Sequence, residues 1–173
     1  ELHFKVEDIQ QFLQAASGIG SMKGCILLQF PGKINLEHYS QLEKILEALH
    51  PSDTSQQWPV AVEFRNPAWY ERETTDLLRE FNASMVLHDH AKANNLEGTP
   101  INEVVYLRLH GPDGNYRNAY STEFLENLAA RIGAWLKERK SVYCYFNNSL
   151  GDAFKNAREL QALTNTTPGA VAL

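Results

Sequence analysis

Charged side chains interrupt the apolar runs of this sequence near their C-terminal ends. Glu63 and Arg65 end one run, Asp89 follows a second, and Arg108 and His110 end a third. Burying such groups without partners costs roughly several kcal/mol, so each needs an opposite charge, a hydrogen bond or water. Guanidinium groups hold oxyanions bidentately, whereas carboxylates and imidazoles transfer protons. This set therefore predicts a site that binds an anion and moves a proton.

Amide, phenol and glycine residues at the same run ends would add hydrogen-bonding groups for a ligand. They are Gln29, Asn66, Gly111, Tyr145, Asn147 and Asn148. Because side chains alternate across a strand, residues two positions apart share a face, as Arg108 and His110 do. For His88, Asp89 and His90 the alternation does not say which side chain points inward.

The elements that position these residues follow from the spacing of apolar residues. Strands are predicted at Cys25–Phe30, Val60–Phe64, Ser84–His88, Val104–Leu109 and Val142–Phe146. Helices are predicted over residues 1–16, Leu36–Leu49, Glu71–Phe81, Thr122–Lys137 and Asp152–Leu163. The polar segment 91–102 is interpreted as a long loop. Strand and helix in alternation are typical of a parallel sheet, whose ligand site lies at the carboxyl ends of the strands.

The length of the chain limits how complete such a fold can be. A (β/α)8 barrel takes about 250 residues, whereas the 173 residues here hold about five βα units. The helix-like start without an initiator Met favours a partial TIM-barrel-like α/β fold, its N-terminal strands missing, over an open sheet. We expect one domain over 1–173, with a flexible tail over 165–173.

Composition excludes several classes of protein. The net charge of -5 argues against a surface adapted to duplex DNA or anionic membranes. No apolar run approaches the roughly 18 residues of a membrane span, and no signal-peptide pattern is present. Cys25 and Cys144 each lie in an apolar run, which favours buried thiols in a reducing compartment. The sequence therefore predicts a cytoplasmic protein without membrane contact.

Four motifs resemble the DUF72 family, also called YecE-like proteins. They are CILLQFP (25–31), VAVEFRNPAWY (60–70), VVYLRLHGPDGNYRNAYS (104–121) and VYCYFNNSLGDAFKNARELQAL (142–163). The resemblance implies a TIM-barrel-like fold. The family's Gly-Trp/Tyr-rich first strand and its F-Y motif on the second are missing, so the resemblance implies that this chain holds roughly the C-terminal two-thirds of the barrel.

The resemblance also selects the residues already chosen from their position. Glu63, Arg65 and Asn66 match the family's E-F-R-[NH] strand end, and Asp89 matches its strand-end Asp. The other two strand ends, Y-x-R-x-H-G and Y-x-F-N-N, are matched by Arg108, His110, Gly111, Tyr145, Asn147 and Asn148. The family carries no established activity, so the resemblance implies a fold but no reaction.

The leading hypothesis is an enzyme or binder for a phosphorylated or other anionic small ligand at the carboxyl ends of the strands. Arg65 and Arg108 would clamp the anion. Glu63 or Asp89 would act as general base, and His110 as acid or electrophile. Asparagine amides and the backbone of the glycine would add donors. Either Tyr116 or Trp69 could close the site.

Three other functions stay open. A metal-dependent phosphodiester hydrolase on nucleic acid would use Glu63, Asp89, His90 and His110 as ligands, although neighbouring arginines disfavour a cation. A glycosidase-type hydrolase would pair Glu63 with Asp89. A non-enzymatic module would bind RNA or a protein through the arginines. No metal site is favoured, since the spacing of His88 and His90 is more typical of solvated loop histidines.

Several properties are not fixed by the sequence alone. It identifies no cofactor, substrate or reaction. Glu63 paired with Arg65 or Arg108 could also be an ion pair that fills the interior. Open sheet edges would favour self-association of the chain.

Overall fold

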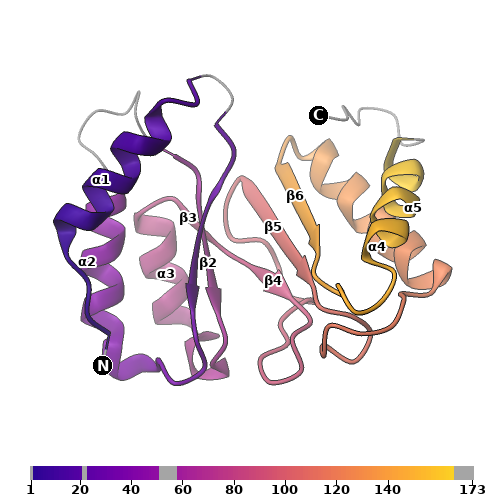
Figure 1. Ribbon diagram of the computed structural model, residues 1–173, viewed down its shortest axis with the longest axis horizontal. Coiled ribbons are helices and arrows are strands. Elements are labelled where there is room, and N and C mark those ends of the chain that lie inside the picture. The colour runs from indigo at the N-terminus through magenta and orange to yellow at the C-terminus, as the bar shows by residue number, and fades with distance from the viewer. Residues whose placement is uncertain (1, 21–22, 51–57, 166–173) are drawn as a thin grey trace. The chain divides into compact units, whose positions relative to one another are not determined.

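The computed structural model describes residues 2–20, 23–50 and 58–165. The chain divides into two compact units, Glu1–Met85 and Val86–Leu173, and each contains its own three-stranded parallel sheet (Figure 1). Most of the tail expected over 165–173 lies outside the described residues. Among the described helices, none is both long and apolar enough to cross a membrane.

The first unit is built on strands β1 (Ile26–Phe30), β2 (Val60–Phe64) and β3 (Ala83–Met85), in that order. Its helices are α1 (Val6–Ser17), η1 (Leu36–His38), α2 (Tyr39–Leu49), η3 (Pro67–Trp69) and α3 (Arg72–Glu80). Asn35 caps the start of η1, because its Oδ1 accepts a hydrogen bond from the Glu37 N–H at 3.2 Å.

Trp69 belongs to the core of the first unit. Its side chain is fully buried, and its ring stacks on Phe64 with centroids 4.8 Å apart and on Phe30 at 6.3 Å. The indole N–H donates to the carbonyl of Ile34 at 2.9 Å, which satisfies its one polar group. The hypothesis that Trp69 closes a ligand site is therefore wrong.

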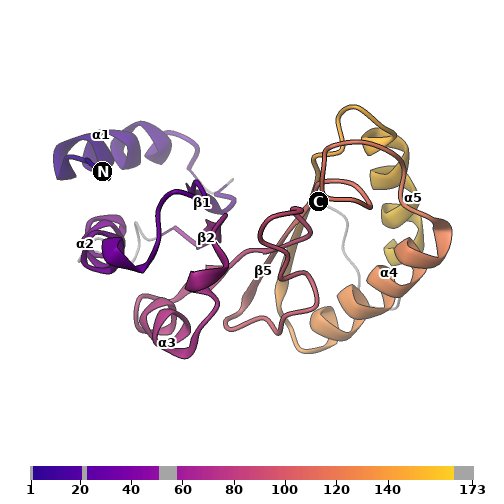
Figure 2. The ribbon, with the colours of Figure 1, turned by 90° about the horizontal axis from the view of Figure 1, so that it is seen from below.

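The second unit is built on strands β4 (Leu87–His88), β5 (Val104–Leu109) and β6 (Ser141–Phe146), in that order. Helices α4 (Thr122–Lys137) and α5 (Ala153–Asn165) pack together on one side of this sheet (Figure 2). The first of them begins at Ser121, whose Oγ accepts from the Phe124 N–H at 3.2 Å.

Alternation along β5 separates a core face from a polar face. Leu107 and Leu109 are fully buried and pack in one cluster with Leu125 and Leu128 of α4. Burying a leucine of this kind stabilises the fold by roughly 1.5–3 kcal/mol. Arg108 lies between the two β5 leucines in sequence, so its side chain leaves the opposite face of the sheet.

The predicted strands and helices are confirmed, mostly within two residues at their ends, but the first helix, predicted over residues 1–16, begins only at Val6. The run predicted over Ser84–His88 forms two strands, because β3 pairs with β2 in one sheet and β4 pairs with β5 in the other. Segment 91–102 contains neither helix nor strand, as expected. The parallel α/β architecture is therefore correct, and closure of its strands into one barrel stays a prediction.

Candidate functional site

Glu63 and Arg65 form an ion pair within the first unit. The carboxylate is fully buried and accepts from Nε of Arg65, whose side chain is 10% exposed. The shared face predicted from strand alternation is confirmed. Gln29 lies beside Glu63 in register on β1 and is exposed. The carboxylate offsets the charge of the guanidinium. This pair therefore matches the alternative interpretation of the sequence, in which Glu63 and Arg65 form an ion pair that fills the interior.

Tyr70 and Asn66 fix the loop that follows β2. The hydroxyl of Tyr70 donates to the carbonyl of Phe64 at 2.8 Å. Burial and the nearby Glu63 carboxylate raise the pKa of Tyr70, while Arg65 opposes the shift, so the phenol remains a neutral donor. Oδ1 of Asn66 accepts from Ala68 and its Nδ2 donates to the carbonyl of Gly32. In this structure Asn66 therefore shapes the loop.

In the second unit, three polar residues occupy one row across the sheet. His88, Arg108 and Tyr145 are register partners on β4, β5 and β6. Tyr145 stacks on Tyr106 with ring centroids 5.0 Å apart and is 44% exposed. This register settles the orientation that the sequence left open, because His88 lies on the polar face and Asp89 is directed to the helix side.

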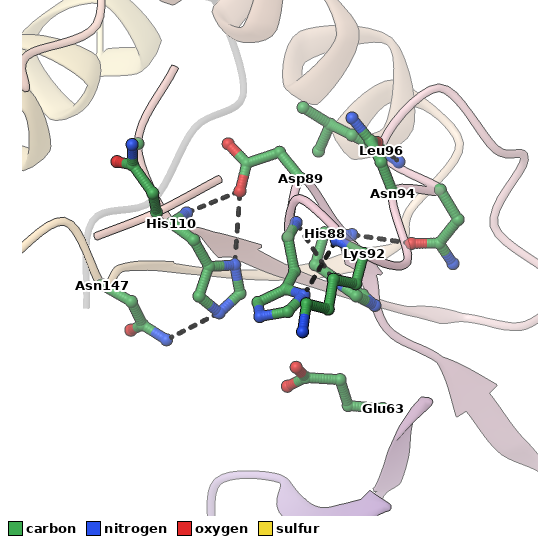
Figure 3. Close-up of polar contacts among 12 residues, drawn as sticks. Glu63, His88, Asp89, Lys92, Asn94, Leu96, His110 and Asn147 are labelled. Atoms are coloured by element: carbon green, nitrogen blue, oxygen red, sulfur yellow. Dashed lines mark hydrogen bonds and ion pairs between the residues drawn. The ribbon is translucent and has the colours of Figure 1, made fainter. Parts of the chain in front are cut away.

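Asp89 joins the backbone and the ring of His110. Its Oδ1 accepts from the His110 backbone N–H at 2.6 Å and lies 3.3 Å from Nδ1 of the same residue (Figure 3). The imidazole is fully buried and the carboxylate is 7% exposed. A carboxylate at this position can accept a hydrogen bond from Nδ1 and so fixes the orientation of the ring.

Tyr120 holds the other oxygen of Asp89. Its hydroxyl donates to Oδ2 and accepts from the Gly111 backbone N–H at 2.6 Å. Burial and the hydrogen bond to Asp89 raise the pKa of Tyr120 far above its ordinary value. The phenol is therefore a permanent donor at neutral pH, and Asp89 is held from two sides.

Asn147 connects Arg108 with His110. With its amide oxygen turned toward the guanidinium, it accepts from Nη2 of Arg108 at 2.6 Å and from Nε at 3.0 Å. In that orientation the same oxygen also lies 3.4 Å from Nε2 of His110, along the contact dashed in Figure 3. The oxygen therefore marks the direction in which the guanidinium presents its donors.

His88 and His90 use their Nδ1 atoms to accept backbone hydrogen bonds. Nδ1 of His88 accepts from the N–H of His90, and Nδ1 of His90 accepts from the N–H of Lys92, both at 3.3 Å. The ring of His90 also lies edge to face with His110, with centroids 5.6 Å apart, and with Tyr116 at 6.2 Å. In the part of the chain that the structure describes, no three His, Cys, Asp or Glu side chains are arranged to hold a metal ion.

Two glycines permit close backbone packing here, Gly111 within the loop after β5 and Gly114 between that loop and the loop after β4. At Gly111, with φ +100°, a Cβ would lie 2.2 Å from the carbonyl oxygen of Arg117. At Gly114, with φ +63°, a Cβ would lie 2.3 Å from both the backbone carbonyl oxygen of Asp89 and the backbone nitrogen of Ala91. The loop after β6 joins them, because the Leu150 N–H donates to the carbonyl of Tyr116 at 3.0 Å.

Gly111 and Asn148 both donate hydrogen bonds inside the protein. The N–H of Gly111 donates to Tyr120, as described above. Asn148 is fully buried, and its Nδ2 donates to the carbonyl of Asn118 at 2.9 Å and to Oδ1 of Asn156 at 3.3 Å. Both residues hold loops in place here, and their predicted contact with a ligand stays a prediction.

The second unit thus brings together four of the predicted site residues, Asp89, Arg108, His110 and Asn147. Sequence reasoning missed Tyr120, which holds Asp89 in place. The only hint in the sequence was the position of this tyrosine, immediately before Ser121, the cap residue of a predicted helix.

Comparison with known proteins gives a consistent family assignment. A sequence model of the DUF72 family, described as a protein of unknown function, matches residues 1–172. A solved DUF72 family protein from Enterococcus faecalis V583 is 27% identical with a TM-score of 0.77, over 94% of this chain and 70% of that one. A second, from Thermotoga maritima MSB8, is similar in fold at 22% identity and a TM-score of 0.68, over 92% of this chain and 65% of that one. No curated protein matches the chain.

Proposed function

This chain belongs to the DUF72 family, and from that premise we propose that its second unit binds an anionic small molecule at the carboxyl ends of β5 and β6. The observation that carries the proposal is the arrangement of Arg108, Asn147 and His110. The family has no described activity, so the proposal rests on these side chains rather than on a relative.

Arg108 supplies the positive charge for the anion. Its two donors already meet an oxygen of Asn147 at 2.6 and 3.0 Å. An oxygen of a carboxylate or phosphate makes the same kind of contact and adds charge to it, which roughly doubles the strength of each hydrogen bond. The half-buried position of Arg108 reduces screening by solvent.

His110 is the proton-transferring group of the proposed site, and Asp89 is its positioning residue. The carboxylate lies against Nδ1 and orients the ring, so that Nε2 is the nitrogen on the side of Asn147 and Arg108. An imidazole oriented by a carboxylate in this way is the usual arrangement of a general acid or base. Both groups come from one unit of the chain.

Calorimetric titration with inorganic phosphate tests the anion site. Arg108→Gln should weaken binding by at least about tenfold, because the amide keeps a hydrogen bond but removes the charge. Arg72→Gln is the matched control, because it removes the same charge at a side chain that is 88% exposed and lies in the other unit. Equal affinities of the Arg108→Gln variant and the unmodified chain, at unchanged thermal stability, would contradict the proposal.

A further inference from the structure

Three tyrosines stack on the face of the second sheet that carries Arg108. The ring of Tyr106 on β5 stacks on Tyr143 and on Tyr145 of β6, with centroids 6.1 and 5.0 Å apart and interplanar angles of 27° and 23°. The three side chains share a face, because Tyr106 and Tyr143 are register partners and Tyr145 is two positions further along β6. The stack therefore extends toward the carboxyl ends of the strands.

This stack is covered at one end and open at the other. Tyr106 is 5% exposed and Tyr143 is half-buried, whereas Tyr145 is 44% exposed. One side of the Tyr145 ring packs on Tyr106, so its exposed area lies on the opposite side and at the edges. A ring that a neighbour already holds loses little freedom on binding, and a planar ligand would extend a stack that the protein has begun.

Arg108 lies directly beside this exposed ring. Arg108 and Tyr145 are register partners on strands that lie about 4.8 Å apart, so their side chains leave the same face as neighbours. The guanidinium reaches Asn147, two positions after Tyr145, whose oxygen accepts from Nη2 at 2.6 Å and from Nε at 3.0 Å. One small molecule can therefore contact the ring and the guanidinium at the same time.

We propose that the ligand of this site is an anion that carries a planar aromatic ring, which stacks on the exposed side of Tyr145 while the charged group binds Arg108. The inference rests on the proposed anion site and deepens it, because it names the class of anion. A phosphate or carboxylate joined directly or by a short link to an aromatic ring makes both contacts. An inorganic or short aliphatic anion makes only the contact with Arg108.

Two phosphate monoesters separate the ring from the charge. Phenyl phosphate and methyl phosphate carry the same charged group, and only the first has a ring. In calorimetric titrations of the unmodified chain, we expect phenyl phosphate to bind about tenfold more tightly, which is the usual size of a stacking contact.

A matched pair of variants assigns that preference to Tyr145. Tyr145→Leu removes the ring and should reduce the preference for phenyl phosphate to about threefold or less, whereas Tyr145→Phe keeps the ring and should retain it. Both variants should bind methyl phosphate as the unmodified chain does, because Arg108 is unchanged. Thermal unfolding checks that both variants are folded.

The outcomes distinguish this inference from the proposed function. If Arg108→Gln weakens the binding of methyl phosphate but phenyl phosphate binds no more tightly than methyl phosphate, the anion site stands and the aromatic class falls. A preference that persists in Tyr145→Leu also overturns the inference, because the ring then rests elsewhere. If Tyr145→Leu removes the preference and Arg108→Gln changes neither affinity, the stacking contact stands and the guanidinium clamp falls. Binding of neither ester overturns both.

Nuclear magnetic resonance locates the bound ring directly. The ring current of a ligand stacked on Tyr145 shifts the resonances of the Tyr145 ring protons upfield. We expect this shift with saturating phenyl phosphate and not with methyl phosphate. Tyr145 resonances that respond equally to the two esters overturn the inference whatever the affinities are.

Discussion

Tyr120 donates its hydroxyl hydrogen to Oδ2 of Asp89, although the two residues lie 31 positions apart. The same hydroxyl accepts the backbone N–H of Gly111, which directly follows His110. One phenol thus fixes both the carboxylate that faces the imidazole and the backbone beside it.

Removing this hydroxyl should destabilise the second unit. Tyr120→Phe leaves an oxygen of Asp89 and the N–H of Gly111 without their partner, and each buried polar group left unsatisfied costs roughly 1–3 kcal/mol. Urea unfolding measures the loss. Tyr39→Phe is the control, because its hydroxyl makes one exposed hydrogen bond, to the carbonyl of Glu73 at 3.3 Å. Equal losses in the two variants would contradict the role of Tyr120.

Breaking the buried ion pair of the first unit should cost more than replacing it. Glu63→Leu alone removes the carboxylate that pairs with the largely buried guanidinium of Arg65, with an expected loss of about 3–5 kcal/mol in the free energy of unfolding. Replacing both residues, with Leu at 63 and Met at 65, should recover a large part of that loss. A double-mutant cycle from denaturant unfolding gives the coupling. Losses that simply add would show that the two side chains act independently.

Alkaline pH should weaken the fold through its two partly buried thiols. Burial raises the pKa of Cys144 from 9.0 to about 12, and that of Cys25 likewise to about 12. Between pH 9 and 12 the unfolded chain loses these protons while the folded chain keeps them, so the free energy of unfolding falls as pH rises.

The slope of that fall approaches about 1.4 kcal/mol per pH unit for each thiol. Urea unfolding at pH 7.5 and pH 10.5 measures it. Cys144→Ala should have a shallower pH dependence than the unmodified chain, whatever its absolute stability. An identical pH dependence would mean that the Cys144 thiol does not contribute.

A side chain at Gly111 should be poorly tolerated. Gly111→Ala places a Cβ 2.2 Å from the carbonyl oxygen of Arg117 at a φ of +100°. Backbone strain and the clash should together cost more than about 2 kcal/mol. Gly24→Ala is the control, since nothing lies within 4 Å of a Cβ there. Thermal unfolding of the two variants compares them, and a mild effect at position 111 would mean that this loop can move aside.

Sequence periodicity was sufficient to predict the helices and strands, and to predict which neighbouring residues of one strand share a face. Arg108, near the end of β5, and His110, just after it, are expected to share a face because they are two positions apart, and Glu63 meets Arg65 for the same reason. The four helices after the first were expected close to where they occur, since their apolar spacing matches the buried positions.

The remaining features depend on contacts between distant segments. Tyr120 reaches Asp89 only because two loops meet. No pattern in a short stretch of sequence predicts a contact between residues 31 positions apart. The same holds for Asn147, whose neighbours on β5 follow from sheet register rather than from its own sequence. The strand predicted over Ser84–His88 is divided because its two ends pair with different strands.

The backbone packing at Gly111 and Gly114 also bears on how this site can change during evolution. Loops at strand ends usually accept insertions, and new specificities often arise in that way. Here the segment from 111 to 118 lies against the loops that follow β4 and β6, through contacts that leave no space for a methyl group. Lengthening one of these loops would displace the other two. Variation at this site should therefore occur by exchange of side chains, at constant loop length.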